Sequence, residues 1–356
     1  MDYTLSPEQI RRLDRSAYLD LLMTFPRQLG RAGQIAAEVS VDRPARPINK
    51  VLVAGMGGSA IGGDLLRTYL LDDLSVPILV HRDYSLPPFV DADTLVLLSS
   101  YSGDTEETLS ACEQALQRKS SIVGIASGGR LAERAAREGF PLIRIPGGMP
   151  PRAAIGYSFA ALLGCLVKIG LVNDRTADLE ETGKLLERRK SSYGIQVEAS
   201  ENLAKQLAAH LFGQFPVIYA WAWRYGAVAA RWRGQLAELG KQLSSHHLLP
   251  EMNHNEIAGW EHPAGILSQA VVVLLRDRDE PEPIRRRMVL TEKFLTSRAG
   301  RVVDVWASGR SLLARLFSLV YLGDFVSYYL AALNGVDPTP IESIEQFKSR
   351  LAGEDI

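Results

Sequence analysis

At 356 residues the chain is longer than one ordinary hydrophobic core requires, so its length favours two α/β domains. Hydrophobic residues make up 46% and charged residues 23%, which is typical of a soluble globular protein. The formal net charge of −1 gives no support to a nucleic-acid-binding protein or to one that binds an anionic membrane.

The cysteine content and the apolar segments indicate where the protein resides. Cys112 and Cys165 are the only cysteines, too few for a disulfide framework and compatible with a reducing cytosol. The first residues lack a basic segment followed by an apolar one, so no signal peptide is predicted. The most apolar segment, 153–167, contains Gly, Ser and Tyr and is better interpreted as a buried helix than as a membrane span. We therefore expect a cytoplasmic protein.

The first half of the chain alternates between strand and helix patterns after a helical N-terminal segment at 1–40. Apolar runs that predict strands lie at 51–53, 77–80, 95–98, 122–125 and 142–145. Helical patterns lie between most of them, at 60–71, 105–119 and 131–138, and a long helix is expected at 152–171. This alternation predicts a parallel sheet that is covered by helices on both faces.

The second half repeats this organisation without obvious sequence repetition. A charged segment at 174–190 shows no strand pattern and is expected to bridge the two halves. Strands are then predicted at 217–221, 248–250, 270–275 and 302–306, with helices at 224–241 and 284–298. The helix after Ser311 is apolar nearly all round and should be buried. A last helix is expected at 339–351, with Pro340 in its first turn.

These patterns predict an α/β fold with two doubly wound parallel sheets and with flanking and C-terminal helices. We divide the chain into an N-terminal helical segment at 1–47 and a first sheet domain at 48–173. A connecting helical segment at 174–210 and a second sheet domain with the C-terminal helix at 211–356 complete it. In open α/β sheets, ligands bind beyond the carboxyl ends of the strands, so the residues that follow each strand are the candidates for function.

A glycine-rich stretch at 50–64 follows the first predicted strand. It continues from an apolar run into Gly55, Gly57, Gly58 and Ser59, and then into a helical pattern. The backbone N–H groups and the dipole at such a helix start attract anions, most often phosphate. The spacing is neither the dinucleotide-binding G-x-G-x-x-G pattern nor a Walker loop. The alternative interpretation is a turn in which glycine only permits close packing.

A second candidate loop follows the third predicted strand, at 99–108. Ser100, Ser102 and Thr105 lie in a turn with Gly103 that leads into a helix. Hydroxyl groups and helix N-terminal amides can bind a phosphate without any lysine. The absence of a cation favours a phosphomonoester on a small molecule over a nucleoside triphosphate with Mg²⁺. The alternative is ordinary capping of the helix, for which one hydroxyl is enough.

Four motifs in this order carry a family resemblance over nearly the whole chain. The segments GMGGSAIGGD at 55–64 and SSYSGDTEET at 99–108 resemble the sugar isomerase (SIS) domain. With Pro151-Arg152-Ala153 and HNEIAGW at 254–260, the chain resembles the bifunctional phosphoglucose/phosphomannose isomerase family. The resemblance implies a homodimeric SIS-domain enzyme of carbohydrate metabolism, in glycolysis and gluconeogenesis, whose active site lies at the subunit interface.

The resemblance also implies which residues bind the substrate. The phosphate-binding residues would be Gly58, Ser59, Ser100, Ser102 and Thr105. Arg152 would face the sugar, where its charge can stabilise an enediolate intermediate. The alternative for Arg152 is a solvated residue at a helix start, where a cation is mildly unfavourable against the helix dipole.

Aldose–ketose isomerisation needs a base that moves a proton between C1 and C2 and a group that opens the sugar ring. The resemblance implies that Glu238 is the base and that His254, sixteen residues later, assists ring opening. The flanks of Glu238 depart from the family pattern N-E-N-A-K, because Ala237 and Leu239 replace both asparagines and Gly240 replaces the alanine. Glu256, inside the better preserved motif, is therefore a rival base.

Lys348 completes the implied catalytic set. It occupies the lysine position of the pattern T-P-x-x-x-I-x-x-x-K that begins at Thr339, and would assist ring opening or hold the charge of the intermediate. The alternative is a basic residue near a helix C-terminus, which is favourable in itself. His246, His247 and His254 could be imagined as metal ligands, but nothing fixes their geometry, and we expect no metal or cofactor.

The sequence thus predicts an isomerase that interconverts glucose 6-phosphate, and mannose 6-phosphate as well, with fructose 6-phosphate through a cis-enediolate. The expected partners are a small sugar phosphate and a second copy of the chain, with no nucleic acid and no membrane. Two alternatives stay open: a non-catalytic SIS module that senses a sugar phosphate, and an amino-sugar-phosphate isomerase or deaminase.

Overall fold

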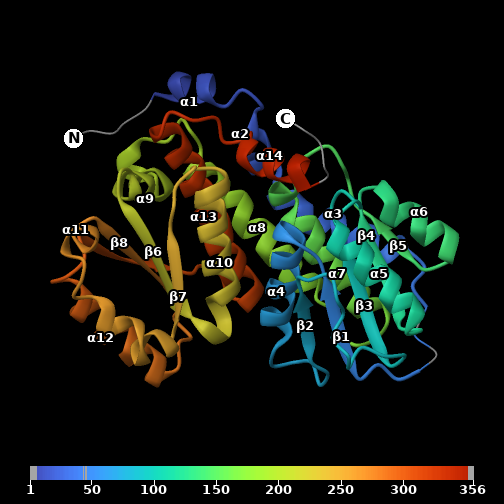
Figure 1. The fold of residues 1–356 in the computed structure, drawn as a ribbon. Coiled ribbons are helices and arrows are strands. Elements are labelled where there is room, and N and C mark those ends of the chain that lie inside the picture. Colours follow the sequence, from blue (N-terminus) through green and yellow to red (C-terminus); the bar gives the residue numbers. More distant parts are fainter. Residues whose placement is uncertain (1–5, 43, 45, 352–356) are drawn as a thin grey trace.

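The computed structural model describes residues 6–42, 44 and 46–351, and it contains two parallel β-sheets (Figure 1). The first sheet has the strand order β2-β1-β3-β4-β5. Its strands are β1 (Lys50–Ala54), β2 (Ile78–His81), β3 (Thr94–Ser99), β4 (Ser121–Ala126) and β5 (Leu142–Arg144). The second sheet has the order β7-β6-β8-β9. Its strands are β6 (Phe215–Trp221), β7 (Ser245–Leu249), β8 (Ala270–Arg276) and β9 (Arg301–Trp306). The predicted fold class, α/β with two doubly wound parallel sheets, is confirmed.

Helices surround both sheets and connect them. Before and around the first sheet lie α1 (Pro7–Leu13), α2 (Tyr18–Thr24), α3 (Pro26–Glu38), α4 (Gly57–Leu70), α5 (Glu106–Gln117), α6 (Gly129–Glu138), η1 (Pro151–Ala153) and α7 (Ile155–Lys168). The connection contains α8 (Thr176–Tyr193), η2 (Ala199–Glu201) and α9 (Leu203–Leu211). Around the second sheet lie α10 (Ala222–Glu238), η3 (Glu251–His254), η4 (Glu256–Gly259), α11 (Ala264–Leu267), α12 (Glu282–Leu295), α13 (Leu312–Leu333) and α14 (Glu342–Leu351).

Several strands have continuous apolar sequences rather than alternating apolar and polar residues, because both of their faces are buried in the core. All residues of β3 and β8 are buried, because helices cover both faces of a parallel sheet. As predicted, α7 is largely buried, and so is α13. By length and composition α13 would qualify as a membrane span, but 94% of its most apolar window is buried inside the protein, as in the core helix of a globular domain.

The two halves are packed against each other through helices. In Figure 1, α4 from the first half and α10 from the second lie side by side between the two sheets, and residues of the two helices are in contact. The bridging segment is α8, which packs on both α3 and α13. These contacts bring loops of the first sheet close to the end of α10.

Several predicted boundaries differ from the structure, and three of these differences are described here. The helix expected at 152–171 is split into η1 and α7, so Arg152 lies in a 3-10 turn rather than at the start of an α-helix. The strand expected at 248–250 is β7, which ends at Leu249. The last helix begins at Glu342, and the backbone N–H of Glu345 donates to the Ile341 carbonyl oxygen. Pro340 therefore precedes the helix and is not in its first turn.

The topology selects one edge of the first sheet as a binding edge. The chain runs from β1 outward to β2 and then returns to β3 on the other side of β1. The strand order therefore reverses between β1 and β3, and the loops that follow these two neighbouring strands leave the sheet in opposite directions. Open α/β sheets bind ligands at such a point. These loops are the glycine-rich stretch and the hydroxyl-rich stretch.

Candidate functional site

The glycine-rich loop and the hydroxyl-rich loop contact each other at the β1/β3 edge. The backbone N–H of Tyr101 donates to Ser59 Oγ at 3.3 Å. A Cβ at Gly55 would lie 2.6 Å from the Ser99 carbonyl oxygen, so only glycine allows this approach of the two strands' ends. Ser59 and Ser100 are both buried. We call the set of hydroxyls from Ser59, Ser100, Ser102 and Thr105 the hydroxyl cradle.

The three hydroxyls of the second loop are organised by one another and by backbone amides. Ser100 Oγ and Thr105 Oγ1 are 2.9 Å apart, and the N–H of Gly103 donates to Ser100 Oγ at 3.1 Å. Ser102 Oγ accepts from the N–H of Asp104 at 3.2 Å, and this side chain is exposed. The loop thus presents hydroxyl oxygens rather than charged groups.

Neither helix that begins at this edge is capped by a side chain. Thr105 precedes α5, and Met56 precedes α4, but neither side chain accepts a hydrogen bond from its helix. The capping interpretation of Thr105 is therefore wrong, since its hydroxyl pairs with Ser100 instead. The backbone N–H groups at the starts of α4 and α5 therefore have no side-chain cap, an arrangement that favours a bound anion.

Arg152 packs directly on the glycine-rich loop. A Cβ at Gly58 would lie 2.9 Å from the carbonyl oxygen of Pro151 and 3.4 Å from the Cα atom of Arg152. Glycine at position 58 therefore allows η1 to approach the start of α4. This contact places the Arg152 backbone next to the glycine-rich loop.

The guanidinium of Arg152 is buried and held by backbone carbonyls from the C-terminal segment. Only 4% of this residue is exposed, so the solvated alternative for Arg152 is wrong. Its Nη2 donates to the carbonyl oxygens of Pro338 at 3.1 Å and Thr339 at 2.5 Å, and it lies over the Tyr18 ring. Its Nε is a buried donor without a hydrogen-bond partner among the described residues. Buried donors of this kind usually have a partner, and here a ligand can supply it.

The buried ion pair between Arg231 and Asp324 holds the backbone of Arg152, and the sequence patterns did not predict it. Arg231 Nη2 donates to the carbonyl oxygen of Arg152 at 3.0 Å and to Asp324 Oδ2 at 2.7 Å. Gln235 Nε2 donates to Asp324 Oδ1 at 2.9 Å. Burial raises the pKa of Asp324, and the neighbouring Arg231 opposes that rise. Asp324 is the only carboxylate in the apolar α13, which is the signal that could have identified it from sequence.

Glu238 is the last residue of α10 and faces Arg152. Its Oε2 lies 3.7 Å from Arg152 Nη1, and 32% of the Glu238 side chain is exposed. Lys241 Nζ donates to the Glu238 carbonyl oxygen at 2.7 Å. Burial and then the nearby Arg152 lower the pKa of Lys241. Glu238 and Lys241 line a cleft of about 690 Å³ together with residues 336–337 and 340–344, so the carboxylate is accessible.

The rival base, Glu256, is engaged in a different contact. The hydroxyl of the buried Tyr219 donates to Glu256 Oε1, and the indole N–H of Trp260 donates to that hydroxyl at 2.9 Å. His247 Nδ1 lies 3.9 Å from Glu256 Oε2. The Glu256 side chain therefore anchors η4 to β6 rather than projecting freely.

The structure does not bring His254 or Lys348 to Glu238 within one chain. His254 is exposed at the end of η3, and Lys348 is exposed on α14. Glu238 precedes β7 while His254 follows it, so the two residues lie at opposite ends of that strand. In the part of the chain that the structure describes, no hydrogen bond or ion pair joins either residue to Glu238. The described residues also contain no group of three or more His, Cys, Asp or Glu side chains placed to hold a metal ion.

Comparisons with known proteins identify the sequences that this chain resembles. Residues 200–351 match the family described as the bacterial phospho-glucose isomerase C-terminal SIS domain. The chain is 44% identical over 328 residues to a bifunctional phosphoglucose/phosphomannose isomerase of Caldicellulosiruptor bescii, covering 92% of this chain and 97% of that protein. It is 36% identical over 306 residues to the protein of the same name from Aquifex aeolicus, covering 86% of this chain and 91% of that one.

A solved structure supports the fold alone. A hypothetical protein from Thermus thermophilus superposes with a TM-score of 0.76 at 18% identity, and the match covers 97% of this chain and 93% of that one. The sequence similarity to the Caldicellulosiruptor bescii protein extends over 92% of this chain, and not only over the motifs from which the site was predicted.

Proposed function

This chain belongs to the bifunctional phosphoglucose/phosphomannose isomerase family, and we propose that it interconverts glucose 6-phosphate and mannose 6-phosphate with fructose 6-phosphate at the Arg152–Glu238 pair. The enzyme class is that of an isomerase, an intramolecular oxidoreductase. The observation that carries the location is the 3.7 Å approach of a buried guanidinium to a partly exposed carboxylate beside the hydroxyl cradle.

The phosphate of the substrate binds in that cradle. Ser59, Ser100, Ser102 and Thr105 supply hydroxyl donors, and the uncapped N-termini of α4 and α5 supply backbone N–H groups. Gly58 serves this site by allowing Arg152 to approach. A phosphomonoester fits a cradle of neutral donors, because its charge is met by several hydrogen bonds and two helix dipoles.

Glu238 moves the proton. Its carboxylate removes the proton at C2 of the open-chain aldose and delivers it to C1, while a hydroxyl proton passes from O2 to O1. The cis-enediolate between these steps carries negative charge on its oxygens, which the guanidinium of Arg152 stabilises. A planar enediolate has no configuration at C2, so one base can serve both epimers.

Ring opening is assigned to His254 and Lys348. Because His254 is exposed and lies beyond the far end of β7 from Glu238, we propose that a neighbouring subunit supplies it to the site. The protein is then a homodimer whose active sites lie at the interface, without a metal or other cofactor.

The proposal also includes a cytoplasmic location. It divides the chain into segments 1–47, 48–173, 174–210 and 211–356.

The deciding experiment measures fructose 6-phosphate formation from each aldose phosphate, with EDTA present. The parent enzyme should turn over both substrates, and Glu238→Ala should lose about 10²–10⁴-fold in kcat, the usual contribution of a positioned base. An exposed carboxylate outside the site, changed in Glu133→Ala on α6, is the matched control and should leave both rates unchanged.

Three other outcomes would change the assignment. Activity that survives Glu238→Ala would transfer the base to Glu256 or another group. Binding of fructose 6-phosphate without turnover by the parent would indicate the non-catalytic sensor. Release of ammonia from an amino-sugar phosphate would indicate the third alternative.

A further inference from the structure

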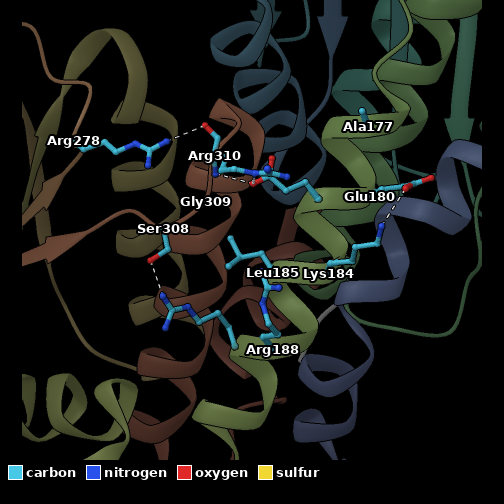
Figure 2. Close-up of a pocket in the computed structure, with 11 residues that line it drawn as sticks. Ala177, Glu180, Lys184, Leu185, Arg188, Arg278, Ser308, Gly309 and Arg310 are labelled. Atoms are coloured by element: carbon cyan, nitrogen blue, oxygen red, sulfur yellow. Dashed lines mark hydrogen bonds and ion pairs between the residues drawn. The ribbon is translucent and has the colours of Figure 1, made fainter.

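A second cleft, of about 760 Å³, opens at the carboxyl edge of the second sheet, between α8 and the loop from β9 to α13 (Figure 2). One wall is α8, with Lys184, Arg188 and Arg189. The opposite wall carries Arg278, two residues after β8, and Arg310, just before α13. None of the residues that line it belongs to the Arg152–Glu238 site. Its location beyond the ends of parallel strands is a common position for ligand binding.

Positive charge exceeds negative charge in this cleft. Five of its lining residues are cationic and two, Glu180 and Glu181, are acidic. Both oxygens of Glu181 are already engaged, since they accept from the N–H groups of Arg310 at 2.7 Å and Ser311 at 3.1 Å. Glu180 pairs with Lys184 at 3.3 Å. The carboxylates of the cleft therefore leave most of its arginines without a counter-charge.

Three of the four arginines carry this surplus, whereas Arg310 Nε lies 3.7 Å from Glu181 Oε1. The side chain of Arg188 makes no hydrogen bond or ion pair with any residue that the structure describes. Arg189 donates from Nη2 to Ser308 Oγ at 2.8 Å, and no carboxylate lies within ion-pair distance of it among the described residues. Arg278 donates to the carbonyl oxygen of Arg310 at 3.3 Å and otherwise reaches only Asp279, at an exposed position. Lys184 and Arg188 are one helical turn apart, where like charges repel.

We propose that this cleft binds a small polyanion that carries at least two phosphoryl groups. Guanidinium groups bind phosphoryl oxygens through paired N–H donors, which makes arginine the preferred residue for such ligands. Because cations occupy both walls, one phosphoryl group contacts α8 and the other contacts Arg278 and Arg310. Of the described residues that line the cleft none is aromatic, so it offers no surface for stacking a nucleobase. A bisphosphorylated sugar or an inorganic polyphosphate fits this lining.

The test uses pyrophosphate as the probe in isothermal titration calorimetry on the full-length protein. The substrate cradle is first weakened with the double variant Ser100→Ala/Thr105→Val, so that binding at the second cleft dominates the measurement. This protein should bind about one pyrophosphate per chain, and adding Arg188→Ala and Arg278→Ala should weaken binding by about tenfold or more, because hydrogen bonds to charged groups are lost. Orthophosphate should bind at least about tenfold more weakly, since it spans only one wall.

Two further variants make the result decisive. Arg137→Ala/Arg298→Ala removes two exposed arginines elsewhere and should leave binding unchanged. Arg188→Lys/Arg278→Lys keeps the positive charges and serves as the test if the alanine variants do not fold. It should bind pyrophosphate with intermediate affinity. The proposal is overturned if pyrophosphate fails to bind, if the Ser100→Ala/Thr105→Val protein loses all binding, or if the control pair weakens it as much as the cleft pair.

Discussion

Arg152 Nη1 and Glu238 Oε2 lie 3.7 Å apart, although the two residues come from different halves of the chain. The Arg152 side chain is almost completely buried, whereas the Glu238 carboxylate is partly open to the cleft. The guanidinium is therefore fixed, and a substrate can contact the carboxylate. At this distance the carboxylate is not held in a short bidentate contact, and it keeps oxygen lone pairs for a proton. The buried Arg152 is then a pre-organised donor rather than a mobile side chain.

The first prediction concerns Arg152→Lys. An ammonium group cannot contact Pro338, Thr339 and the reacting oxygens together, because it lacks the planar fork of donors. We expect kcat to fall by about 10- to 100-fold, equivalent to about 1.5–3 kcal/mol for a charged hydrogen bond. Steady-state kinetics with both aldose phosphates measure it. Arg27→Lys, which alters an exposed pair with Glu187, is the control, and equal losses in both variants would contradict the prediction.

The second prediction concerns the buried pair behind Arg152. Asp324→Asn leaves Arg231 without its counter-ion, and breaking a buried pair in this way costs about 3–5 kcal/mol of unfolding free energy. Urea denaturation at pH 7 measures the loss. A double change to Arg231→Met and Asp324→Leu should recover part of it, because no unpaired charge then remains. A loss below about 1 kcal/mol for Asp324→Asn would mean that the carboxyl group is neutral in the folded protein.

The third prediction separates binding from chemistry. Ser100→Ala and Thr105→Val each remove one hydroxyl of the cradle, and the two hydroxyls are in contact. We expect KM for glucose 6-phosphate to rise by about tenfold with kcat changed much less, because the phosphate is bound equally in the ground state and the transition state. Ser268→Ala, at an exposed serine near α11, is the control. A fall in kcat with unchanged KM would place these hydroxyls in the chemical step instead.

Sequence patterns predicted the strands and the two loops because parallel sheets have strong local signals: apolar runs, glycine turns and helix periodicity. They predicted Arg152 beside the cradle only through the resemblance. The Arg231–Asp324 pair was missed because its members are ninety-three residues apart, and no local pattern links them. The start of α14 was misplaced because Pro340 is equally compatible with the residues before a helix and with its first turn. Long-range pairing and helix ends depend on tertiary contacts, which the sequence encodes only indirectly.

The fourth prediction concerns acid stability. Burial, together with the nearby Arg233 and His247, lowers the pKa of His246 from its ordinary value of 6.5, and Glu256 opposes that shift. The folded protein therefore disfavours the protonated imidazole, so this contribution to stability is present above pH 6.5 and is lost as the pH falls through the lowered value. His246→Gln should reduce the difference between urea midpoints at pH 7.5 and pH 5. The exposed His262→Gln is the control, and identical behaviour of the two variants would contradict the assignment.

The fifth prediction tests whether two subunits build one active site. His254 follows β7 while Glu238 precedes it, so an active site with both residues requires the histidine of a second chain. Glu238→Ala and His254→Ala should each be nearly inactive alone. In a mixed dimer one site has lost both residues and the other has retained both. Random mixing by co-expression should therefore restore roughly a quarter of the parent activity. Light scattering verifies the dimer, and a mixed dimer without activity would show that the two residues do not act across the interface.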